Sequence, residues 1–451
     1  MNIDKREFLK NVSEKIKSND LAYFIGAGVS KESGFMDWKE FMKDIIEDLN
    51  LDYKKENDLI TIAQYHKNTK KSRNQLNDKI LNAFSGKGSP NEQLSLLCQL
   101  PVSKIWTTNY DKLIEYEFEK LNKKLDVKIS DSQLTSSLSN PDATLIKMHG
   151  DISDVGNAII TRQDYEYFDE NRKMLIANLI NDINTKTFIF IGYSFSDPNF
   201  NHVLSKIRIH MDANKKIHYY ITKKETGKYN KIKQKLRIDD LKEYGIQTLL
   251  VDEYNDIVNI LKEVRDEIYK NNVFISGSAI AYDEYGTKEE AGALIESIAK
   301  VLIDKNCKVL SGHGLGVGEY VVQGILKGLA DKKNIPDDPF ELKIFPQKID
   351  RIEDRVELWK SLRENLISKS KLAIFMFGNK NEKGTIIDAN GMVNEFEIAL
   401  KYGLKIIILA STGYTAKKLS VKYNETKNVY IIDETDKDLI IKKILQIQAK
   451  K

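Results

Sequence analysis

Short apolar segments rich in Val, Ile, Phe and Tyr recur along the chain, and each stops at glycine or small polar residues. Longer segments of helical period lie between them. Buried parallel strands have this composition, and their connections need helical crossovers. The first series, between residues 21 and 251, comprises LAYFIG, KIWTTN, TLIKMHG, TFIFIGY, IHYYIT and IQTLLV. The second, from residue 272 to residue 433, comprises NVFISGS, CKVLSGHG, LKIFPQ, LAIFMFG, KIIILAS and VYIID. The pattern predicts α/β architecture with mostly parallel sheets.

Two successive series predict two Rossmann-like domains, and a chain of 451 residues is long enough for them. The polar pair Asn271-Asn272 marks the break, so we expect domains at 1–270 and 271–451. Residues of about 38–100 have helical spacing without strand character, as in FMKDIIEDL, and are expected to form a helical insertion.

The N-terminal segment DKREFLKNVSEKI predicts an amphipathic helix. Asp4 and Glu7 have the spacing of a capping box. The apolar face that follows comprises Phe8, Leu9, Val12 and Ile16. At this level the helix could pack on its own domain or dock on a neighbouring subunit.

Composition excludes several classes of protein. The net charge is only +4 and no long run of like charges occurs, so we expect no nucleic-acid partner. The two cysteines, Cys98 and Cys307, cannot form a disulfide framework or a four-cysteine zinc site. The N-terminus is charged from its fourth residue and no apolar stretch approaches membrane-spanning length. These features predict a cytoplasmic protein that does not bind membranes or a metal.

The stretch LAYFIGAGVSKESG has the form of a phosphate-binding turn after a strand. Gly26 and Gly28 would let the backbone approach a phosphate closely, because glycine has no Cβ. In the usual dinucleotide fingerprint G-x-G-x-x-G the third glycine comes sooner than Gly34 does here. A tight turn without a ligand therefore remains an alternative for this motif alone.

Three further stretches end predicted strands, where ligands bind in open α/β sheets. They are WTTNYD, IKMHGD and IGYSFSDPN. Taken singly, Asn109 could be a turn former, His149 a core histidine, and the run from Ser194 to Asp197 a helix cap. Their occurrence together after the glycine turn favours a ligand site.

These motifs resemble the sirtuin superfamily, in its zinc-free SIR2-like branch, over roughly residues 10 to 265. The matching segments are Gly26-Ala27-Gly28-Val29-Ser30 with Ser33-Gly34, Thr107 to Asp111, His149-Gly150, and Gly192-Tyr193-Ser194. The resemblance implies that NAD lies across the strand ends, with Asn109 orienting the water or ribose and His149 as general base. Asp111 would face the nicotinamide amide. The implied NAD-binding set is Gly26, Ala27, Gly28, Ser30, Asp111, Gly192 and Ser194.

Departures from the sirtuin pattern bear on the reaction. The zinc ribbon of protein deacylases is missing, FMDWKE stands in place of IPDFR, and Thr108 replaces the usual Gln. Loss of neutral nicotinamide needs an oriented attacker and a base, which an imidazole can supply at neutral pH. NAD⁺ is then the substrate and no cofactor is expected. The alternatives are an NAD-dependent protein deacylase and a non-catalytic nucleotide-binding scaffold.

The second series contains glycine-rich turns that suit anion binding, above all SGHGLGVGEY. It resembles the SLOG superfamily over about residues 272 to 435, with Arg363 on a helix and Gly391 to Glu395 in the place of the GTxxE motif. PGG is absent and Met392 replaces Thr, so a sensor is favoured over a second enzyme. The implied effector-binding set is Gly277, Ser278, Gly312, Gly314, Leu315, Gly316, Arg363, Lys380 and Glu395.

A SIR2-like domain followed by a SLOG domain resembles the effector of the Thoeris antiphage system. The resemblance implies that the second domain binds a cyclic ADP-ribose isomer made by a TIR-domain partner. Binding would activate NAD⁺ hydrolysis and deplete NAD in abortive infection. It also implies a homotetramer. The isomer, and the choice between NAD and NADP, stay open in the sequence.

Overall fold

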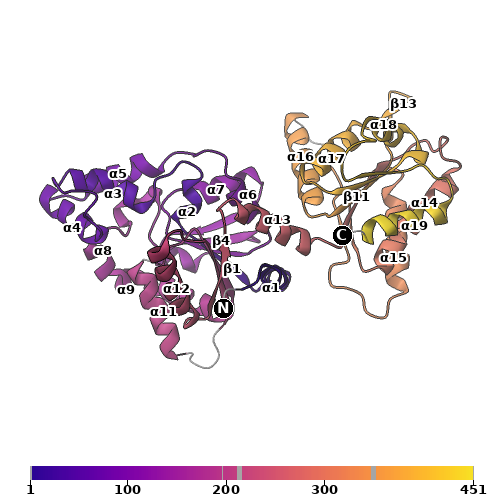
Figure 1. The fold of residues 1–451 in the computed structure, drawn as a ribbon. Helices are drawn as coiled ribbons and strands as arrows, with labels where there is room; N and C mark the ends of the chain where they lie inside the picture. Colours follow the sequence, from indigo (N-terminus) through magenta and orange to yellow (C-terminus); the bar gives the residue numbers. More distant parts are fainter. Residues whose placement is uncertain (1–2, 196, 211–215, 347–351, 450–451) are drawn as a thin grey trace. The chain divides into compact units, whose positions relative to one another are not determined.

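The computed structural model describes residues 3–195, 197–210, 216–346 and 352–449. The chain divides into two compact units, Met1–Ile268 and Tyr269–Lys451, each with its own sheet and core (Figure 1). Both units have helices on the two faces of a parallel sheet, so the predicted α/β architecture is confirmed.

The first unit contains a seven-stranded sheet in the order β3-β4-β2-β1-β5-β6-β7, in which neighbouring strands are parallel. Six strands coincide with the apolar segments of the first series. The strands are β1 (Leu21–Ile25), β2 (Lys104–Thr107), β3 (Leu125–Lys128), β4 (Ala143–Lys147), β5 (Thr187–Ile191), β6 (His218–Lys223) and β7 (Ile246–Val251). The pattern missed β3, because Asp126 and Lys128 give it a polar sequence. They form a buried ion pair of 2.8 Å on one face of this edge strand.

Side chains alternate between the two faces of this sheet, as strand geometry requires. On β1, Tyr23 and Ile25 belong to one buried cluster, whereas Ala22 and Phe24 belong to the other. The other strands of the sheet and the surrounding helices complete each cluster. The helices are α1 (Lys5–Lys17), α2 (Ala27–Lys31), α3 (Trp38–Glu47), α4 (Leu59–Lys70), α5 (Asn74–Phe84), α6 (Glu92–Gln99), α7 (Leu113–Lys120), α8 (Arg162–Glu166), α9 (Phe168–Asn171), α10 (Lys173–Thr185), α11 (Pro198–His210), α12 (Lys228–Lys242) and α13 (Asp256–Ile268). The helices α3 to α6 occupy the stretch that was expected to form a helical insertion.

Helix α1 packs within its own domain. Its buried residues Phe8, Val12 and Ile16 join the cluster that contains the apolar face of α13. Lys5 at its first turn forms an ion pair of 2.7 Å with Glu263 of α13. Asp4 caps the helix by accepting the N–H of Arg6. The apolar face of α1 is therefore already covered by residues of the same domain.

The second unit contains a six-stranded parallel sheet in the order β10-β9-β8-β11-β14-β15 and a separate hairpin. The strands are β8 (Asn272–Ser278), β9 (Lys308–Ser311), β10 (Phe340–Leu342), β11 (Leu372–Phe377), β14 (Lys405–Leu409) and β15 (Val429–Ile432), and the hairpin is β12 (Asn379–Glu382) with β13 (Thr385–Asp388). The helices are α14 (Lys288–Asp304), α15 (Gly318–Ala330), α16 (Ile352–Ser368), α17 (Asn390–Lys401), α18 (Tyr414–Lys422) and α19 (Lys437–Ala449). The sequence did not predict the hairpin.

The prediction of a strand at LKIFPQ is wrong in position, because the strand lies earlier, at β10. Strand β10 pairs with Val309 to Ser311 of β9 through Phe340 to Leu342 and then ends. Pro346 cannot donate a ladder hydrogen bond, which disfavours a strand continuing through this segment. Gln347, at the end of the expected strand, lies outside the described residues.

Strand order and register bring the sequence motifs of the first unit together. Ile25 at the end of β1 is paired with Thr107 of β2 on one side and Ile191 of β5 on the other. Thr107 is paired in turn with Lys147 at the end of β4. The strand order proceeds outward from β1 in both directions. The carboxyl ends of β1 and its neighbours therefore form a topological switch point, where ligands bind in such sheets. In the second sheet the equivalent point lies between β8 and β11.

Among the residues with an assigned position, no helix has both the length and the apolar character that crossing a membrane would require.

Candidate active site

The glycine turn after β1 is packed against the turn after β5. Gly26 donates its N–H to the carbonyl of Ile191, and Gly28 donates to that of Gly192, both at 2.9 Å. A Cβ on Gly26 would come within 2.4 Å of the Gly192 carbonyl oxygen, and one on Gly28 within 2.9 Å. Gly192 has a φ of +63° and faces Val29 equally closely. The approach of two backbones is thus sufficient to require these glycines, before any phosphate is considered.

Ser30, Asn109 and Asp111 form a buried chain of hydrogen bonds across two loops. Asn109 Nδ2 donates to Ser30 Oγ at 3.0 Å, and Ser30 Oγ donates to Asp111 Oδ2 at 2.9 Å. Asp111 Oδ1 accepts the N–H of Leu113 at 3.0 Å. Thr107, at the end of β2, positions this loop by accepting the Asn109 N–H. The carboxylate expected to face nicotinamide therefore has a protein donor on each oxygen.

The amide of Asn109 has one atom without a partner. Its Oδ1 is buried and accepts no hydrogen bond from the described residues, whereas its Nδ2 is used by Ser30. An unsatisfied buried carbonyl costs about 1–3 kcal/mol, so native proteins rarely retain one without a reason. Oδ1 is an acceptor suited to a ligand hydroxyl or a water.

His149 follows β4 and is held by its backbone and by aromatic rings. Its carbonyl accepts the N–H of Ile159 at 2.9 Å. The next residue, Gly150, has a φ of +97°, and a Cβ there would lie 3.1 Å from the Cα of Ala158. The imidazole meets the rings of Tyr165 and Phe168 edge-on, with centroids 5.7 and 5.9 Å away. The side chain is therefore buried in a fixed position next to the Asn109 loop.

Asp197 contacts His149, and the sequence analysis did not select it as a site residue. Its Oδ2 lies 3.0 Å from His149 Nε2, a contact of ion-pair length whose angle falls outside hydrogen-bond geometry. Its Oδ1 accepts the N–H groups of Asn199 and Phe200 in the first turn of α11. The helix-cap interpretation of this stretch was correct, and the carboxylate that caps α11 also contacts the imidazole of His149. Ser194 is exposed in the same loop, and Ser196 lies outside the described residues.

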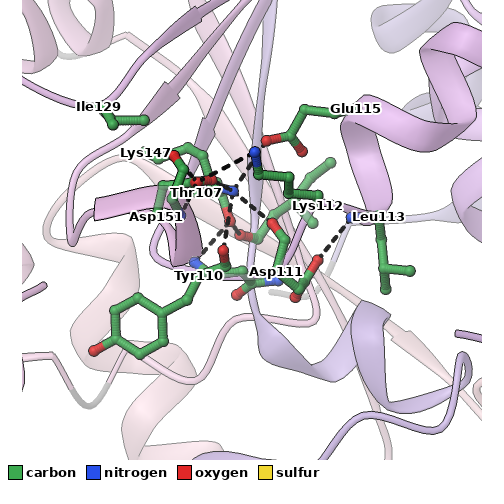
Figure 2. A network of polar contacts seen from close by, with 12 residues as sticks. Thr107, Tyr110, Asp111, Lys112, Leu113, Glu115, Ile129, Lys147 and Asp151 are labelled. Atoms are coloured by element: carbon green, nitrogen blue, oxygen red, sulfur yellow. Dashed lines mark hydrogen bonds and ion pairs between the residues drawn. The ribbon is translucent and has the colours of Figure 1, made fainter. Parts of the chain in front are cut away.

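Lys147 lies beneath the Asn109–Asp111 loop in a network of polar contacts (Figure 2). Its ammonium donates to the backbone carbonyls of Tyr110, at 3.2 Å, and of Asp111, and it pairs with Glu115 at 3.1 Å and with Asp151. Burial alone would lower the pKa of Lys147, but the charges of Glu115 and Asp151 outweigh burial and raise the pKa. Burial raises the pKa of Glu115, while Lys147 overcomes burial at Asp151 and lowers its pKa.

A segment after the His149 loop connects the site to the helical insertion. The Ile159 carbonyl accepts a hydrogen bond of 2.6 Å from Tyr110 Oη. Arg73, between α4 and α5, donates to the carbonyl of Ala158 and pairs with Asp164 at 2.7 Å. Lys147 lies within the IKMHGD stretch and Arg73 outside all the selected stretches, and neither was expected to have a role, because both act on backbone carbonyls that only the folded chain brings near.

In the second unit, Arg363 and Glu395 form a buried pair. Arg363 Nε donates to Glu395 Oε1 at 3.2 Å, and Ser276 Oγ donates to Glu395 Oε2 at 2.6 Å. Burial outweighs these two partners and raises the pKa of Glu395. The guanidinium lies over the rings of Phe345 and Trp359, at 5.1 and 5.6 Å from their centroids. The two effector residues taken from α16 and α17 are therefore brought together.

The glycine-dense loop before α15 packs against the end of β8. A Cβ on Gly314 would lie 2.0 Å from the Gly277 carbonyl oxygen, and one on Gly316, at φ +72°, 1.8 Å from that of Ala279. Ser278 Oγ donates to the Asn379 carbonyl, which precedes Lys380 on the hairpin. Gly312, which follows β9, faces the ring of Phe345, and Leu315 is largely exposed. Gly312, Gly314, Leu315 and Gly316 thus lie on the loop between β9 and α15, next to Gly277 and Ser278 at the end of β8.

No group of three or more His, Cys, Asp or Glu residues with metal-binding geometry occurs within the described ranges. Cys98 and Cys307 are both buried, one in each unit.

Replacing Lys147 by Met is expected to destabilise the first domain by about 3–5 kcal/mol, because it removes the ammonium beside the buried carboxylates of Glu115 and Asp151 and leaves Asp151 with the more distant Lys112, at 3.7 Å. Urea unfolding of the full chain measures the change. The pKa of Asp151 is lowered, so its contribution is present above the unfolded pKa and is lost as the pH falls. The difference between wild type and Lys147→Met should therefore shrink below about pH 4.

Lys43→Met is the matched control, since Lys43 pairs with Glu47 at 3.9 Å and both side chains are more than half exposed. We expect a change of about 0–1 kcal/mol for this exposed pair. Equal effects of the two substitutions would show that the Lys147 network does not support the loop.

Comparison with known proteins agrees with the two-domain architecture. Residues 103–249 match the SIR2-like domain family, and residues 256–451 match the Sir2- and TIR-associating SLOG family. The NAD(+) hydrolase ThsA of Bacillus cereus (strain MSX-D12) is 36% identical over 434 residues, covering 94% of this chain and 90% of that protein. The NAD(+) hydrolase ThsA of Enterococcus faecium is 36% identical over 449 residues, covering 96% and 93%. Defense-associated sirtuin 2 of Bacillus subtilis is 31% identical over 212 residues, which cover 45% of this chain and 20% of that protein. With a SIR2-like domain followed by a SLOG domain, and relatives aligned over nearly its full length, the chain belongs to the family of the NAD(+) hydrolase ThsA proteins.

Proposed function

We propose that the first domain hydrolyses NAD⁺ to nicotinamide and ADP-ribose, and that this activity serves defence. The observation that carries the proposal is the buried Asn109 Oδ1, which has no partner among the described residues and lies on a loop beside that of His149. An acceptor and an imidazole at a topological switch point are the groups needed to hold a water and take its proton. The names of the ThsA relatives and of Defense-associated sirtuin 2 support the substrate and the setting.

In the proposed reaction, Asn109 Oδ1 accepts a hydrogen bond from the attacking water or from a ribose hydroxyl. His149 takes the proton that the water loses. Ser30 holds the Asn109 amide in the required orientation, since it accepts from Nδ2 and donates to Asp111. The nicotinamide leaves as a neutral molecule, so the protein does not have to protonate it.

Protein deacylation, the alternative with a peptide substrate, is disfavoured by the cysteines. Cys98 and Cys307 are buried in different units, and a zinc ribbon on four cysteines cannot be built from them. The polar chain from Ser30 to Asp111 does not depend on such a ribbon. Hydrolysis is therefore the reaction that these residues support.

Replacing His149 by Ala should reduce the rate of NAD⁺ hydrolysis by about 10²–10⁴-fold, the usual effect of removing a positioned base. Asn109→Ala should have a comparable effect. Nicotinamide release by the full chain measures both. The control is His202→Ala, because His202 is exposed on α11 and lies 3.5 Å from the carboxylate of Asp169, which is also exposed. A folded His149→Ala variant with near-normal turnover would contradict the assignment.

We propose further that the second domain is a sensor that binds a cyclic ADP-ribose isomer made by a TIR-domain partner and activates hydrolysis, so that NAD is depleted in abortive infection. The match to a Sir2- and TIR-associating SLOG family supports a TIR-linked signal. Arg363 supports an anionic ligand, because its planar guanidinium can bind phosphate through two parallel hydrogen bonds. Gly391 leaves room beside the Nη2 atom of Arg363, because a Cβ on residue 391 would lie 2.8 Å from that atom. Lys380, on the hairpin, would add a second positive charge.

Arg363→Ala and Glu395→Gln are expected to abolish activation while leaving Asn109 and His149 intact. To change the ratio of active to inactive protein from 1:99 to 99:1, the ligand must bind the active state about 10⁴-fold more tightly than the inactive state, a difference of about 5.5 kcal/mol. NAD⁺ turnover against the concentration of each cyclic ADP-ribose isomer measures this, and the wild-type curve should be sigmoidal if several sites share the task.

The matched control is Lys401→Ala, which removes an exposed ion pair of 2.6 Å with Glu364 between the same two helices, α17 and α16. Its activation curve should follow wild type. If Arg363→Ala responded at the wild-type concentration, the signal would bind elsewhere and the sensor proposal would fail.

We propose that the chain acts as a homotetramer, on the basis of its resemblance to the Thoeris effector. Helix α1 is not a candidate contact, since its apolar face is covered by α13 of the same domain. Light scattering of the full chain at micromolar concentration, with and without a cyclic ADP-ribose isomer, should give about four times the 51.8 kDa chain mass. A monomer in both conditions would contradict this proposal.

A further inference from the structure

We propose that Asp197 is a positioning residue for His149, which holds the imidazole with its proton on Nε2 so that Nδ1 receives the proton of the attacking water. The inference rests on the proposed NAD⁺ hydrolysis. It assigns a role to a side chain that the sequence motifs identified only as part of a helix cap.

The carboxylate of Asp197 is fixed at both oxygens. Oδ1 accepts two backbone N–H groups at the start of α11, from Asn199 at 2.9 Å and Phe200 at 3.1 Å. Oδ2 is then left facing His149 Nε2 at 3.0 Å. Because the cap prevents the carboxylate from rotating, the position of Oδ2 is set by the helix rather than by the histidine.

The imidazole is restrained from the other sides. The rings of Tyr165 and Phe168 meet it edge-on, and the backbone of His149 is bonded to Ile159. Nε2 is buried, and its contact with Asp197 is short but poorly aligned. Hydrogen bonds of catalytic groups are often misaligned without substrate and tighten when it binds. A small rotation of the ring would align this contact.

Asp197 supplies the negative charge next to the imidazole of His149. Burial alone would raise the pKa of Asp197, but His149 and the two backbone N–H groups outweigh it and lower the pKa, so the carboxylate is ionised. The other titratable groups around this pair are phenols and a distant carboxylate. Burial raises the pKa of Tyr165, Tyr193 and Tyr110, which keeps them neutral, and Asp164 is paired with Arg73.

A carboxylate in this position has two effects on a histidine base. It selects the tautomer with hydrogen on Nε2, and it stabilises the imidazolium that forms when Nδ1 takes a proton. In the proposed step the water oxygen bonds to C1′ of the nicotinamide ribose and the C1′–nitrogen bond breaks. The bonding electron pair leaves with nicotinamide, which becomes neutral. The water's proton passes to Nδ1 and later to solvent, and nothing is oxidised or reduced.

The decisive variant is Asp197→Asn in the full chain, because Asn caps a helix about as well as Asp and has nearly the same size. We expect kcat for NAD⁺ to fall by about 10²–10⁴-fold with KM close to wild type, since the loss appears when the imidazolium forms. Assays use the cyclic ADP-ribose isomer that gives the highest wild-type rate.

Asp58→Asn is the matched control. Asp58 caps α4 in the same domain by accepting the N–H of Thr61 at 3.1 Å, and the site residues do not contact it through any described hydrogen bond. This substitution should leave both kcat and KM unchanged. If Asp197→Asn behaved like Asp58→Asn, the positioning role would be overturned.

A second measurement does not depend on turnover. Nitrogen NMR of ¹⁵N-histidine-labelled protein should show His149 with its proton on Nε2 in wild type and a tautomer mixture in Asp197→Asn, the signal being assigned by its loss in His149→Gln. A wild-type tautomer with the proton on Nδ1 would overturn the inference. Wild type that hydrolyses no NAD⁺ would overturn the proposed function instead, and the tautomer would still decide the role of Asp197.

Discussion

The parallel pairing of β1 with β2 on one side and β5 on the other is the constraint on which the site depends. Ile25, Thr107 and Ile191 are in register, and Thr107 is in register with Lys147, so four loops leave the sheet at one edge. Parallel strands need long connections, which explains how motifs separated by up to 165 positions, from Gly26 to Ile191, become neighbours. The hydrogen-bonded chain from Asn109 through Ser30 to Asp111 can form only because this register holds.

Glycine has more than one role in these loops. Gly26, Gly28 and Gly192 are required where two turns approach each other, and Gly314 and Gly316 are required where a loop meets the end of β8. In both units the same absence of a Cβ that would admit a phosphate also admits a second backbone. A glycine-rich turn is therefore weak evidence for a nucleotide until side chains such as Asn109 or Arg363 are found beside it.

The two units use buried charge in different ways. Around Lys147, one ammonium pairs with two carboxylates and donates to two backbone carbonyls, so it fixes the backbone of the loop that carries Asn109 and Asp111. In the second unit, Arg363 and Glu395 hold each other, with Ser276 as a further donor. A buried ion pair of this kind gains little stability by itself, but an anionic ligand that competes for the guanidinium can shift it. This difference agrees with the roles proposed for the two units, a reacting site in the first and a sensing site in the second.

The amino-acid sequence by itself determined the α/β class, the strands that end in the motifs, and the placement of Asn109 and His149 directly after two of those strands, because buried parallel strands and their terminal loops have a recognisable local pattern. It did not reveal β3 or the β12–β13 hairpin, which are short strands that contain polar residues, and it misplaced β10. Only the tertiary structure decided that Asn109 Oδ1 lacks a partner, that Lys147 supports the loop, and that Asp197 faces His149. Those facts depend on the distances between side chains far apart in the chain, which packing and strand register set and local sequence does not encode.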